Sequence, residues 1–426
     1  MIEQLYQTFL KSTGVSTDTR TIQDGNIWVA LKGPNFNANK FAQQALESGA
    51  MAVVVDDPEF ANNDQCILVE DGLEALQKLA NHHRRQFKIP VLGITGSNGK
   101  TTTKELVRDV LAKKFNVLAT KGNLNNHIGV PLTLLGLNSD IEFAIIEMGA
   151  NHQKEIAALS SIAEPEFGLI TNIGKAHLEG FGGLEGVFKG KTELYEFISA
   201  RKGKLFVNSR NERLLKKAHA LVDEVYTYPE EGDYFHAKLV SNKPNVKLKS
   251  DSGKLTSTNL GGEYNFENMC AALCIGRYFG VEEDDALEAI AAYQSDNNRS
   301  QLLKRDSNTI FLDAYNANPT SMSLSLQNFA SEEGYKVAIL GDMFELGDEA
   351  QQEHYAIGEL STTLSIDLVI FCGKLMEAAH RANPDSLYFE SKSGLASFLT
   401  ANKRTDTSYL VKGSRGMSLE SLVELL

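Results

Sequence analysis

The stretch Gly93-Ile-Thr-Gly-Ser-Asn-Gly-Lys-Thr-Thr-Thr103 decides how the chain folds. It joins the apolar run 89–95, a predicted buried strand, to an amphipathic helical pattern. Glycines let backbone N–H groups close around an anion, and the helix N-terminus adds a partial positive charge. Ile94 stands where the general GxxxxGKS/T loop has its first glycine, so the spacing here is GxxGxxGKTT. A plain structural turn is the alternative, but strand, loop and helix all fall where phosphate binding requires.

Two side chains of this loop have chemistry suited to a nucleotide. Lys100 is expected to reach the terminal phosphates, and the Thr101 hydroxyl is expected to bind Mg²⁺. The rest of the loop is expected to surround the phosphates of ATP. These loop residues are Gly96, Ser97, Asn98, Gly99 and Thr102. The sequence therefore predicts ATP and Mg²⁺ as cofactors.

Strand and helix patterns alternate along the rest of the chain, which predicts an α/β fold with three domains. Residues 1–85 are expected to form a small α/β domain, and 86–295 a central P-loop domain whose parallel or mixed sheet is flanked by helices. Residues 296–426 are expected to form a Rossmann-like domain. Asn318 and Pro319 are typical of the N-cap and first residue of a helix. The basic cluster at 82–85 is interpreted as a solvated helix end.

The composition is that of a soluble globular protein and excludes several kinds of partner. Of 426 residues, 42% are hydrophobic and 23% are charged, and the net charge is −13. Such a surface repels nucleic acid and anionic lipid, and the sequence has no run of about 18 apolar residues that could span a membrane. Residues 1–11 lack the basic and apolar parts of a signal peptide. Four scattered cysteines are typical of a reducing compartment, so we expect a cytoplasmic protein.

The variant phosphate loop resembles that of the Mur ligase family and of its relative folylpolyglutamate synthase. Three further blocks are similar to the branch of that family that adds D-alanyl-D-alanine to UDP-N-acetylmuramoyl-tripeptide. They are Ser16–Arg20 (STDTR) with Trp28–Gly33 (WVALKG), Thr120–Leu134 (TKGNLNNHIGVPLTL), and Asp313–Met322 (DAYNANPTSM) with Gly341–Gly347 (GDMFELG). The resemblance covers essentially the whole chain. The DNPR motif of the neighbouring diamino-acid-adding branch is absent from the sequence.

The resemblance implies a Mg²⁺ site with three residues besides Thr101. Glu147 ends the apolar run FAIIE, and His177 lies in the segment NIGKAHLE. Lys191 occupies the position at which similar ligases carry a carbamate. An ammonium repels Mg²⁺, whereas a carbamate offers it an anionic oxygen. Lys189 is the competing candidate, and a solvated helix lysine is the alternative.

The resemblance also implies how the substrates are held. Asn268 is expected to contact adenine, Arg299 the phosphates and Asp313 the ribose of ATP. Tyr264 stands where the family's adenine motif usually has histidine. Residues for the UDP-sugar peptide and the acyl group are implied at three further places: Asp18, Thr19 and Arg20; Asn123, Asn125 and Asn126; and Asn316, Asn318, Ser414 and Arg415.

The implied reaction activates the carboxylate of UDP-N-acetylmuramoyl-tripeptide as an acyl phosphate and couples it to the amine of D-alanyl-D-alanine. Lys100, Lys191, His177 and Asn316 are the expected catalytic residues, and a monomer is expected. One alternative is another Mur-type or folylpolyglutamate-type amide ligase, which the Ser16–Arg20 block disfavours. The other is a regulatory ATPase, which would hydrolyse ATP without a UDP-muramoyl-peptide and an amine.

Overall fold

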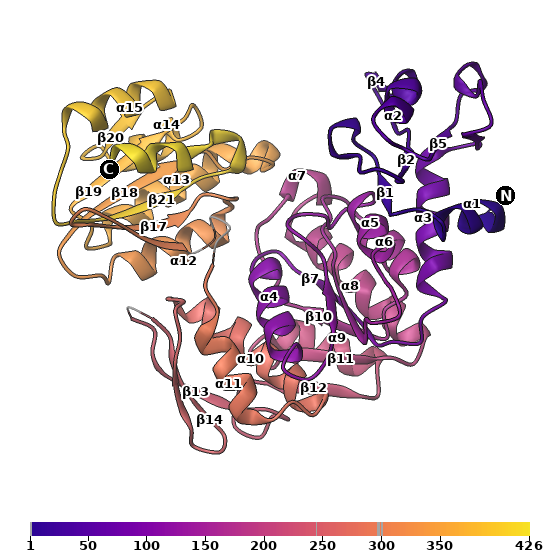
Figure 1. The fold of residues 1–426 in the computed structure, drawn as a ribbon. Helices are drawn as coiled ribbons and strands as arrows, with labels where there is room; N and C mark the ends of the chain where they lie inside the picture. Colours follow the sequence, from indigo (N-terminus) through magenta and orange to yellow (C-terminus); the bar gives the residue numbers. More distant parts are fainter. Residues whose placement is uncertain (1, 244, 296–298, 300) are drawn as a thin grey trace.

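Three sheets, each with its own helices, follow one another along the chain (Figure 1). The computed structural model describes residues 2–243, 245–295, 299 and 301–426. The first and third parts lie at opposite ends of the central part, and the chain termini are far apart (Figure 1). The expected α/β fold is confirmed. Asp296, the expected start of the third domain, lies outside the described residues, and the domain boundaries stay predictions.

The first sheet is parallel and has the order β1-β2-β5-β6. Its strands are β1 (Val15–Ser16), β2 (Ile27–Val29), β5 (Ala52–Val55) and β6 (Cys66–Leu68). This part also contains α1 (Ile2–Phe9), α2 (Ala42–Glu47), α3 (Gly72–Arg84) and a ribbon of β3 (Lys32–Gly33) and β4 (Phe36–Asn37). The middle strands β2 and β5 are buried throughout, as continuous apolar runs in parallel sheets are.

The C-terminal end of α3 anchors the first part to the second. His83 and Arg84 are buried: the His83 ring bonds to Leu137 O at 2.9 Å, and Arg84 Nε donates to Ala163 O at 3.1 Å. Arg84 also forms an ion pair with Glu166 at 2.8 Å. The interpretation of this basic cluster as a solvated helix end is therefore wrong for these two residues. Their partners lie more than fifty residues away in sequence, so a local pattern could not reveal them.

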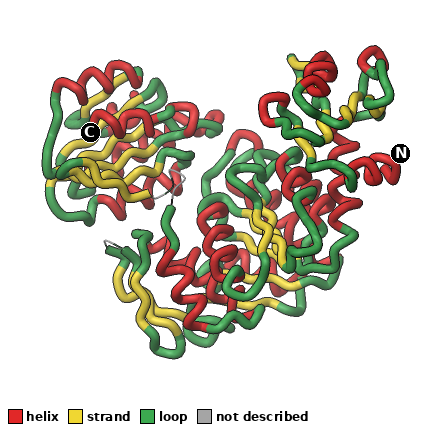
Figure 2. Tube along the Cα trace, viewed as in Figure 1, coloured by secondary structure: helices red, strands yellow, loops and turns green. Residues whose placement is uncertain are grey.

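The second sheet is parallel, has the order β12-β11-β10-β7-β9-β8, and carries the phosphate loop after β7. Its strands are β7 (Val91–Thr95), β8 (Val117–Ala119), β9 (Phe143–Glu147), β10 (Phe167–Ile170), β11 (Lys204–Asn208) and β12 (Val225–Tyr228). Figure 2 shows helices around these strands. The helices of this part are α4 (Lys100–Leu111), α5 (Gly129–Leu134), α6 (Glu155–Ala163), α7 (Leu178–Phe181), α8 (Leu184–Ala200), α9 (Glu212–Leu221), α10 (Glu263–Tyr278) and α11 (Glu283–Ala292).

Strand β9 is apolar at every position before Glu147 because it faces two cores. Phe143 and Ile145 belong to the core that includes residues of α4, α10 and α11. Ala144 and Ile146 belong to the core that includes residues of α6 and α8. Side chains alternate between the faces of a strand, so the run FAIIE fills both. At its end, Glu147 lies at the carboxyl edge of the sheet, where open α/β sheets bind ligands.

A small antiparallel sheet was not predicted from the sequence. It consists of β13 (Ala237–Ser241), β14 (Lys247–Ser250) and β15 (Leu255–Ser257). In β14, Lys247 and Lys249 are exposed while Leu248 and Ser250 are buried. No apolar run marks such a strand, because only one of its faces is covered.

The third sheet has the order β16-β17-β21-β18-β19-β20 and is parallel except for β16. Its strands are β16 (Gln301–Arg305), β17 (Asn308–Asp313), β18 (Tyr335–Gly341), β19 (Leu368–Cys372), β20 (Leu387–Phe389) and β21 (Thr407–Lys412). The helices are α12 (Pro319–Phe329), α13 (Ala350–Thr362), α14 (Glu377–Ala382) and α15 (Lys392–Ala401). Asn318 caps α12 as predicted, and its side chain accepts a hydrogen bond from Ser321 N at 2.9 Å.

Candidate active site

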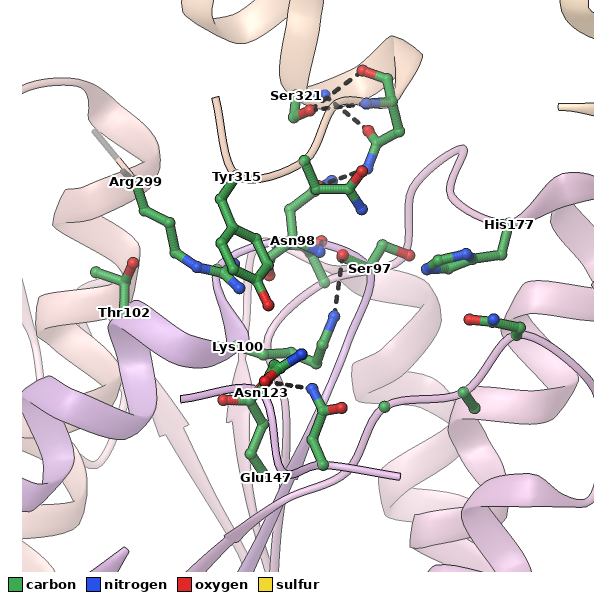
Figure 3. A pocket seen from close by; sticks show the side chains of 18 of the residues that line it. Ser97, Asn98, Lys100, Thr102, Asn123, Glu147, His177, Arg299, Tyr315 and Ser321 are labelled. Carbon is green, nitrogen blue, oxygen red and sulfur yellow. Dashed lines mark hydrogen bonds between the residues drawn. The ribbon is translucent and has the colours of Figure 1, made fainter. Parts of the chain in front are cut away.

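A cavity of about 730 Å³ lies at the carboxyl edge of the central sheet, and side chains from all three parts of the chain line it. Gln77 of α3 comes from the first part, and Leu324 of α12 comes from the third. Figure 3 shows Lys100, Glu147, His177 and other residues around this space. The expected site residues that line the cavity are Ser97, Asn98, Gly99, Lys100, Thr102, Asn123, Asn125, Asn126, Glu147, His177, Asn268, Arg299, Asp313, Asn316 and Asn318.

The phosphate loop requires glycine at two positions. Gly96 has a φ of 145°, and a Cβ there would lie 2.0 Å from Thr171 Oγ1. Gly99 has a φ of 77°, and a Cβ there would lie 2.7 Å from Asn268 Oδ1. Other residues rarely adopt such backbone angles. The loop therefore packs closely against the end of β10 and against α10, and a side chain at either position would push it away.

Lys100 is turned back onto the loop that carries it. Its Nζ donates to Gly96 O at 2.7 Å and to Ser97 O at 3.2 Å. Burial lowers the pKa of Lys100 to about 8; Glu147 opposes this effect, and Arg299 adds to it. The amine is still mostly protonated at neutral pH, and a bound anion would favour the charged form further. It can therefore bind a phosphate once it leaves the two carbonyl groups.

The carboxylate of Glu147 has one oxygen engaged in hydrogen bonds and the other without one. Oε1 accepts from Thr101 Oγ1 at 3.2 Å and from Asn125 Nδ2 at 2.7 Å. Oε2 is buried and has no hydrogen-bond partner among the described residues, although Lys104 Nζ lies 3.8 Å away. A buried carboxylate oxygen is costly unless a cation or donor binds it. The hydroxyl and carboxylate oxygens here fit Mg²⁺, which prefers such ligands.

The other two expected metal ligands have hydrogen-bond partners other than this carboxylate. His177 Nδ1 is hydrogen-bonded to the Glu345 carboxylate from the third part of the chain, and this bond lowers the pKa of Glu345. Lys191 Nζ donates to Ala150 O at 3.1 Å and lies 5.1 Å from the centre of the Phe181 ring. Within the described ranges, no three His, Cys, Asp or Glu side chains form a group that could hold a metal ion.

Lys189 and Lys191 of α8 lie in different environments. Lys191 is 1% exposed, whereas Lys189 is exposed to solvent. Burial and the nearby Lys100 lower the pKa of Lys191 well below its ordinary value. A lower pKa increases the fraction of neutral amine, which is the form that reacts with CO₂. The difference supports Lys191 and not Lys189 as the carbamate candidate, and the carbamate itself stays a prediction.

Asn268 supports the phosphate loop from α10. Its Oδ1 accepts from Thr103 Oγ1 at 3.0 Å, and its Nδ2 donates to Asn265 Oδ1 at 3.1 Å. Each amide atom can form one further hydrogen bond. Asn268 can therefore hold helix α4 and still offer one donor and one acceptor to a base in the cavity.

Lys412 begins the C-terminal loop that was expected to face the substrate, but the sequence interpretation assigned it no role of its own. It is 1% exposed, lines the cavity and pairs with Asp313. Asp313 also accepts a hydrogen bond from Ser325 Oγ at 3.0 Å. Asp313 and Lys412 are opposite each other at the ends of the parallel strands β17 and β21. A polar residue at the end of an apolar strand is the signal that could have given Lys412 a role.

The ring of Tyr315 lies against two guanidinium groups. Arg299 is 3.7 Å and Arg415 is 4.9 Å from the ring centre, within cation–π distance. Arg415 is exposed, whereas Ser414 is buried with its Oγ accepting from Phe344 N at 3.0 Å. Neither Ser414 nor Arg415 is among the described residues that line the cavity. The C-terminal loop therefore lies beside the cavity and contacts it through Tyr315.

Asparagines from two parts of the chain shape the cavity. Asn126 Oδ1 accepts from Gly129 N at 2.9 Å and so fixes the start of α5. Asn318 Nδ2 donates to Asn98 Oδ1 at 2.7 Å. This second bond joins the third part of the chain to the phosphate loop.

The expected uridine-binding residues Asp18, Thr19 and Arg20 lie outside the described lining of the cavity. Asp18 caps the 3-10 turn Thr19–Thr21, and Arg20 pairs with it at 2.6 Å. The hydrogen bond from Arg20 lowers the pKa of Asp18 to about 2. The two charges satisfy each other, so a diphosphate would compete with Asp18 for the arginine.

Comparison with known proteins decides the family. Residues 94–276 match the Mur ligase middle domain, and residues 298–415 match the Mur ligase glutamate ligase domain. The UDP-N-acetylmuramoyl-tripeptide–D-alanyl-D-alanine ligase of Bacillus subtilis (strain 168) is 35% identical, covering 96% of this chain and 92% of that protein. The ligase of the same name from Escherichia coli (strain K12) is 36% identical, covering 97% and 93%. The chain belongs to the Mur ligase family.

Solved structures have the same Mur ligase fold. MurF from Acinetobacter baumannii superimposes with a TM-score of 0.88 at 31% identity, over 100% of this chain and 98% of that one. MurF ligase from Thermotoga maritima in complex with ADP gives a TM-score of 0.86 at 27% identity, over 98% and 97%. The expected three-domain Mur ligase architecture is confirmed.

Proposed function

We propose that this Mur ligase joins D-alanyl-D-alanine to UDP-N-acetylmuramoyl-tripeptide with ATP and forms the UDP-muramoyl-pentapeptide precursor of peptidoglycan. The observation that carries the proposal is the shared cavity. The phosphate loop, the asparagines of segment 120–126 and the segment 313–318 meet there. The relatives named for this activity match at least 96% of the chain.

The reaction takes two steps. The γ-phosphoryl group of ATP moves to the terminal carboxylate of the tripeptide, which gives an acyl phosphate and ADP. The neutral amine of D-alanyl-D-alanine then attacks the acyl carbon, and phosphate leaves. Lys100 and Arg299 are proposed to stabilise the charge on the transferred group, since phosphoryl transfer depends mainly on positioning and electrostatics. Asn316 is proposed to orient the acyl group.

Mg²⁺ is proposed to bind at Thr101, Glu147, His177 and a carbamate on Lys191. The buried Oε2 of Glu147, which has no hydrogen-bond partner among the described residues, supports this site. When bound, the ion neutralises phosphate charge. Lys191 has to carry CO₂, because its ammonium would repel the ion, and His177 has to leave Glu345.

The substrates are assigned to residues according to their chemistry. Asn268 suits the edge of adenine, and Asp313, held by Lys412, suits the ribose hydroxyls. Arginine binds diphosphates in a bidentate manner. The uridine diphosphate is assigned to Asp18, Thr19 and Arg20, the muramoyl-peptide to Asn123, Asn125 and Asn126, and the acyl group to Asn316, Asn318 and the loop with Ser414 and Arg415.

We also propose a cytoplasmic monomer with domains at 1–85, 86–295 and 296–426. No helix in the described part of the chain is long and apolar enough to cross a membrane. The net charge of −13 argues against nucleic acid and anionic membranes as partners.

Phosphate release tests the proposal. The enzyme is assayed with ATP, Mg²⁺ and UDP-N-acetylmuramoyl-tripeptides that differ in their third residue, with and without D-alanyl-D-alanine. We expect turnover only when both the nucleotide-sugar peptide and the dipeptide are present. ATP hydrolysis that depends on neither the UDP-muramoyl-tripeptide nor D-alanyl-D-alanine would indicate a regulatory ATPase. Turnover with a different amine would indicate another amide ligase.

A further inference from the structure

Lys104 is a buried cation that the reaction described above does not use. Its side chain is 2% exposed. It lies on α4, three residues after Thr101 and one turn after Lys100, so all three are on neighbouring positions of one helix face. Lys104 is not among the described residues that line the cavity. Because a buried ammonium is costly unless it is paired, its partners indicate what it does.

The partners of Lys104 connect α4 to a segment far away in sequence. Nζ donates to Thr120 O at 2.7 Å. The carboxylates of Glu105 and Glu147 lie 3.6 and 3.8 Å away, beyond hydrogen-bond distance but close enough for charge balance. Thr120 directly follows β8 and is the first residue of segment 120–126, which contains the cavity-lining asparagines.

Segment 120–126 is tied to β9 at both ends. At its start, Thr120 Oγ1 accepts from Glu147 N at 3.0 Å. At its end, Asn125 Nδ2 donates to Glu147 Oε1 at 2.7 Å, and Asn125 O accepts from Gly149 N at 2.7 Å. Lys104 adds the bond that ties this assembly to the helix of the phosphate loop.

We propose that Lys104 is a positioning residue that couples the muramoyl-peptide segment 120–126 to α4. The inference rests on the proposed function, because it takes this segment to bind the UDP-muramoyl-tripeptide. Lys104 holds the carbonyl of Thr120 and balances the charge of Glu147, so the asparagines are in place before the substrate arrives. ADP is assigned to the phosphate loop with Lys100 and to Asn268, Arg299 and Asp313, whereas Lys104 contacts Thr120, Glu105 and Glu147, so ADP binding does not need Lys104.

The test is Lys104→Met, which keeps the length of the side chain and removes its charge. Calorimetry without Mg²⁺ measures the Kd of UDP-N-acetylmuramoyl-tripeptide and, separately, that of ADP. We expect the first Kd to rise about tenfold and the second to change less than about twofold. Lys336→Met is the matched control. Lys336 in β18 is also buried and donates to a carbonyl, Ala330 O, at 2.8 Å, but that partner belongs to the third part of the chain and not to segment 120–126, so neither Kd should change.

Three results would overturn the inference. The first is that Lys104→Met leaves the Kd of UDP-N-acetylmuramoyl-tripeptide unchanged. The second is that Lys104→Met weakens the binding of this substrate and of ADP by the same factor, which a merely structural lysine would give. If Lys104→Met does not fold, Lys104→Gln removes the charge and shortens the reach to Thr120 O while keeping a polar donor, and the same two outcomes decide. The third is a wild-type protein that binds ADP but not the UDP substrate, which would refute the proposed function itself.

Discussion

Asn318 Nδ2 donates a 2.7 Å hydrogen bond to Asn98 Oδ1, across 220 residues of sequence. Asn98 belongs to the phosphate loop of the central domain. Asn318 also caps α12 of the C-terminal domain, with its Oδ1 accepting from Ser321 N at 2.9 Å. One side chain thus starts a helix in one domain and contacts the nucleotide loop of another, and substitutions can separate these two roles.

Asn318→Ser should separate the cap from the contact. Serine caps a helix about as well as asparagine, but it is too short to reach Asn98. We expect kcat to fall about tenfold, or about 1.4 kcal/mol in the barrier, with the melting temperature unchanged. Asn318→Ala loses the cap as well and should lower the free energy of unfolding by about 1 kcal/mol. Phosphate-release kinetics and thermal unfolding measure both effects, and full activity in Asn318→Ser would show that the contact is dispensable.

Lys100→Ala should abolish ligation while the protein stays folded. The side chain bonds only to carbonyls of its own loop among the described residues, so its loss leaves no distant group unpaired. Circular dichroism checks the fold, and phosphate release checks turnover. Lys216→Ala, at an exposed position of α9, is the control that should keep full activity. Near-normal ligation by a folded Lys100→Ala would end its assignment to the phosphates.

Lys191→Ala should lose most activity and regain part of it with added small carboxylates. Such an anion can occupy the place of the carbamate oxygens, which the alanine lacks. Lys189→Ala should be mild by comparison, because Lys189 is exposed and Lys191 is 1% exposed on the same helix. Ligation rates with and without formate or acetate measure the rescue. A larger loss in Lys189→Ala would show that the wrong lysine was chosen.

Arg20→Ala should weaken binding of UDP-N-acetylmuramoyl-tripeptide and leave ADP binding unchanged. Arg20 is exposed, paired with Asp18, and not among the described residues that line the cavity. Loss of a bidentate contact to a phosphate should raise the Kd about tenfold. Isothermal calorimetry measures the two affinities. An unchanged affinity for the UDP substrate would remove Arg20 from the uridine site.

Glu164→Gln should destabilise the protein in a pH-dependent way. Burial alone would raise the pKa of Glu164, but hydrogen bonds from Arg85 and Arg201 outweigh it and lower the pKa from 4.5 to about 2. A carboxyl group whose pKa is lower in the folded protein than in the unfolded chain stabilises the fold at pH values above the unfolded-state pKa. This stabilisation is lost as the pH falls toward the folded-state pKa. We expect a loss of roughly 2 kcal/mol at pH 7 that shrinks as the pH drops below about 4.5.

Urea unfolding at several pH values measures the difference between wild type and Glu164→Gln. Glu231→Gln, at an exposed position whose side chain is 83% accessible, should show no difference at any pH. A Glu164→Gln deficit that stays constant from pH 7 down to about pH 3, well below the ordinary pKa of glutamate, would contradict the ion-pair origin of the effect.

Strands of all three main sheets could be predicted because the apolar runs in the sequence end where the strands end. The runs at 52–55, 143–147 and 368–372 coincide with β5, β9 and β19. The antiparallel sheet β13–β15 could not be predicted, because polar residues alternate with apolar ones in its short strands, such as Lys247 and Lys249 in β14. The burial of Arg84 was also not predicted, since the residues that it contacts, Ala163 and Glu166, belong to another domain.

The site was predictable where a motif lies in one continuous segment. The phosphate loop and Glu147 follow directly from their strands. Lys104 and Lys412 gain their roles from residues that only folding brings close: Thr120 lies 16 residues from Lys104, and Asp313 lies 99 residues from Lys412. No pattern within one segment records such pairs.

The bond between Asn98 and Asn318 has an electrostatic consequence for the whole enzyme. It brings the first turn of α12 to the loop at which α4 begins, so the positive ends of two helices point toward one cavity. The chain as a whole carries −13. At physiological salt, this attraction and the repulsion by the net charge both fade within about 8 Å, so neither acts on nucleotides in bulk solvent. The enzyme therefore retains multiply charged anions that arrive by diffusion, and does not steer them in from a distance.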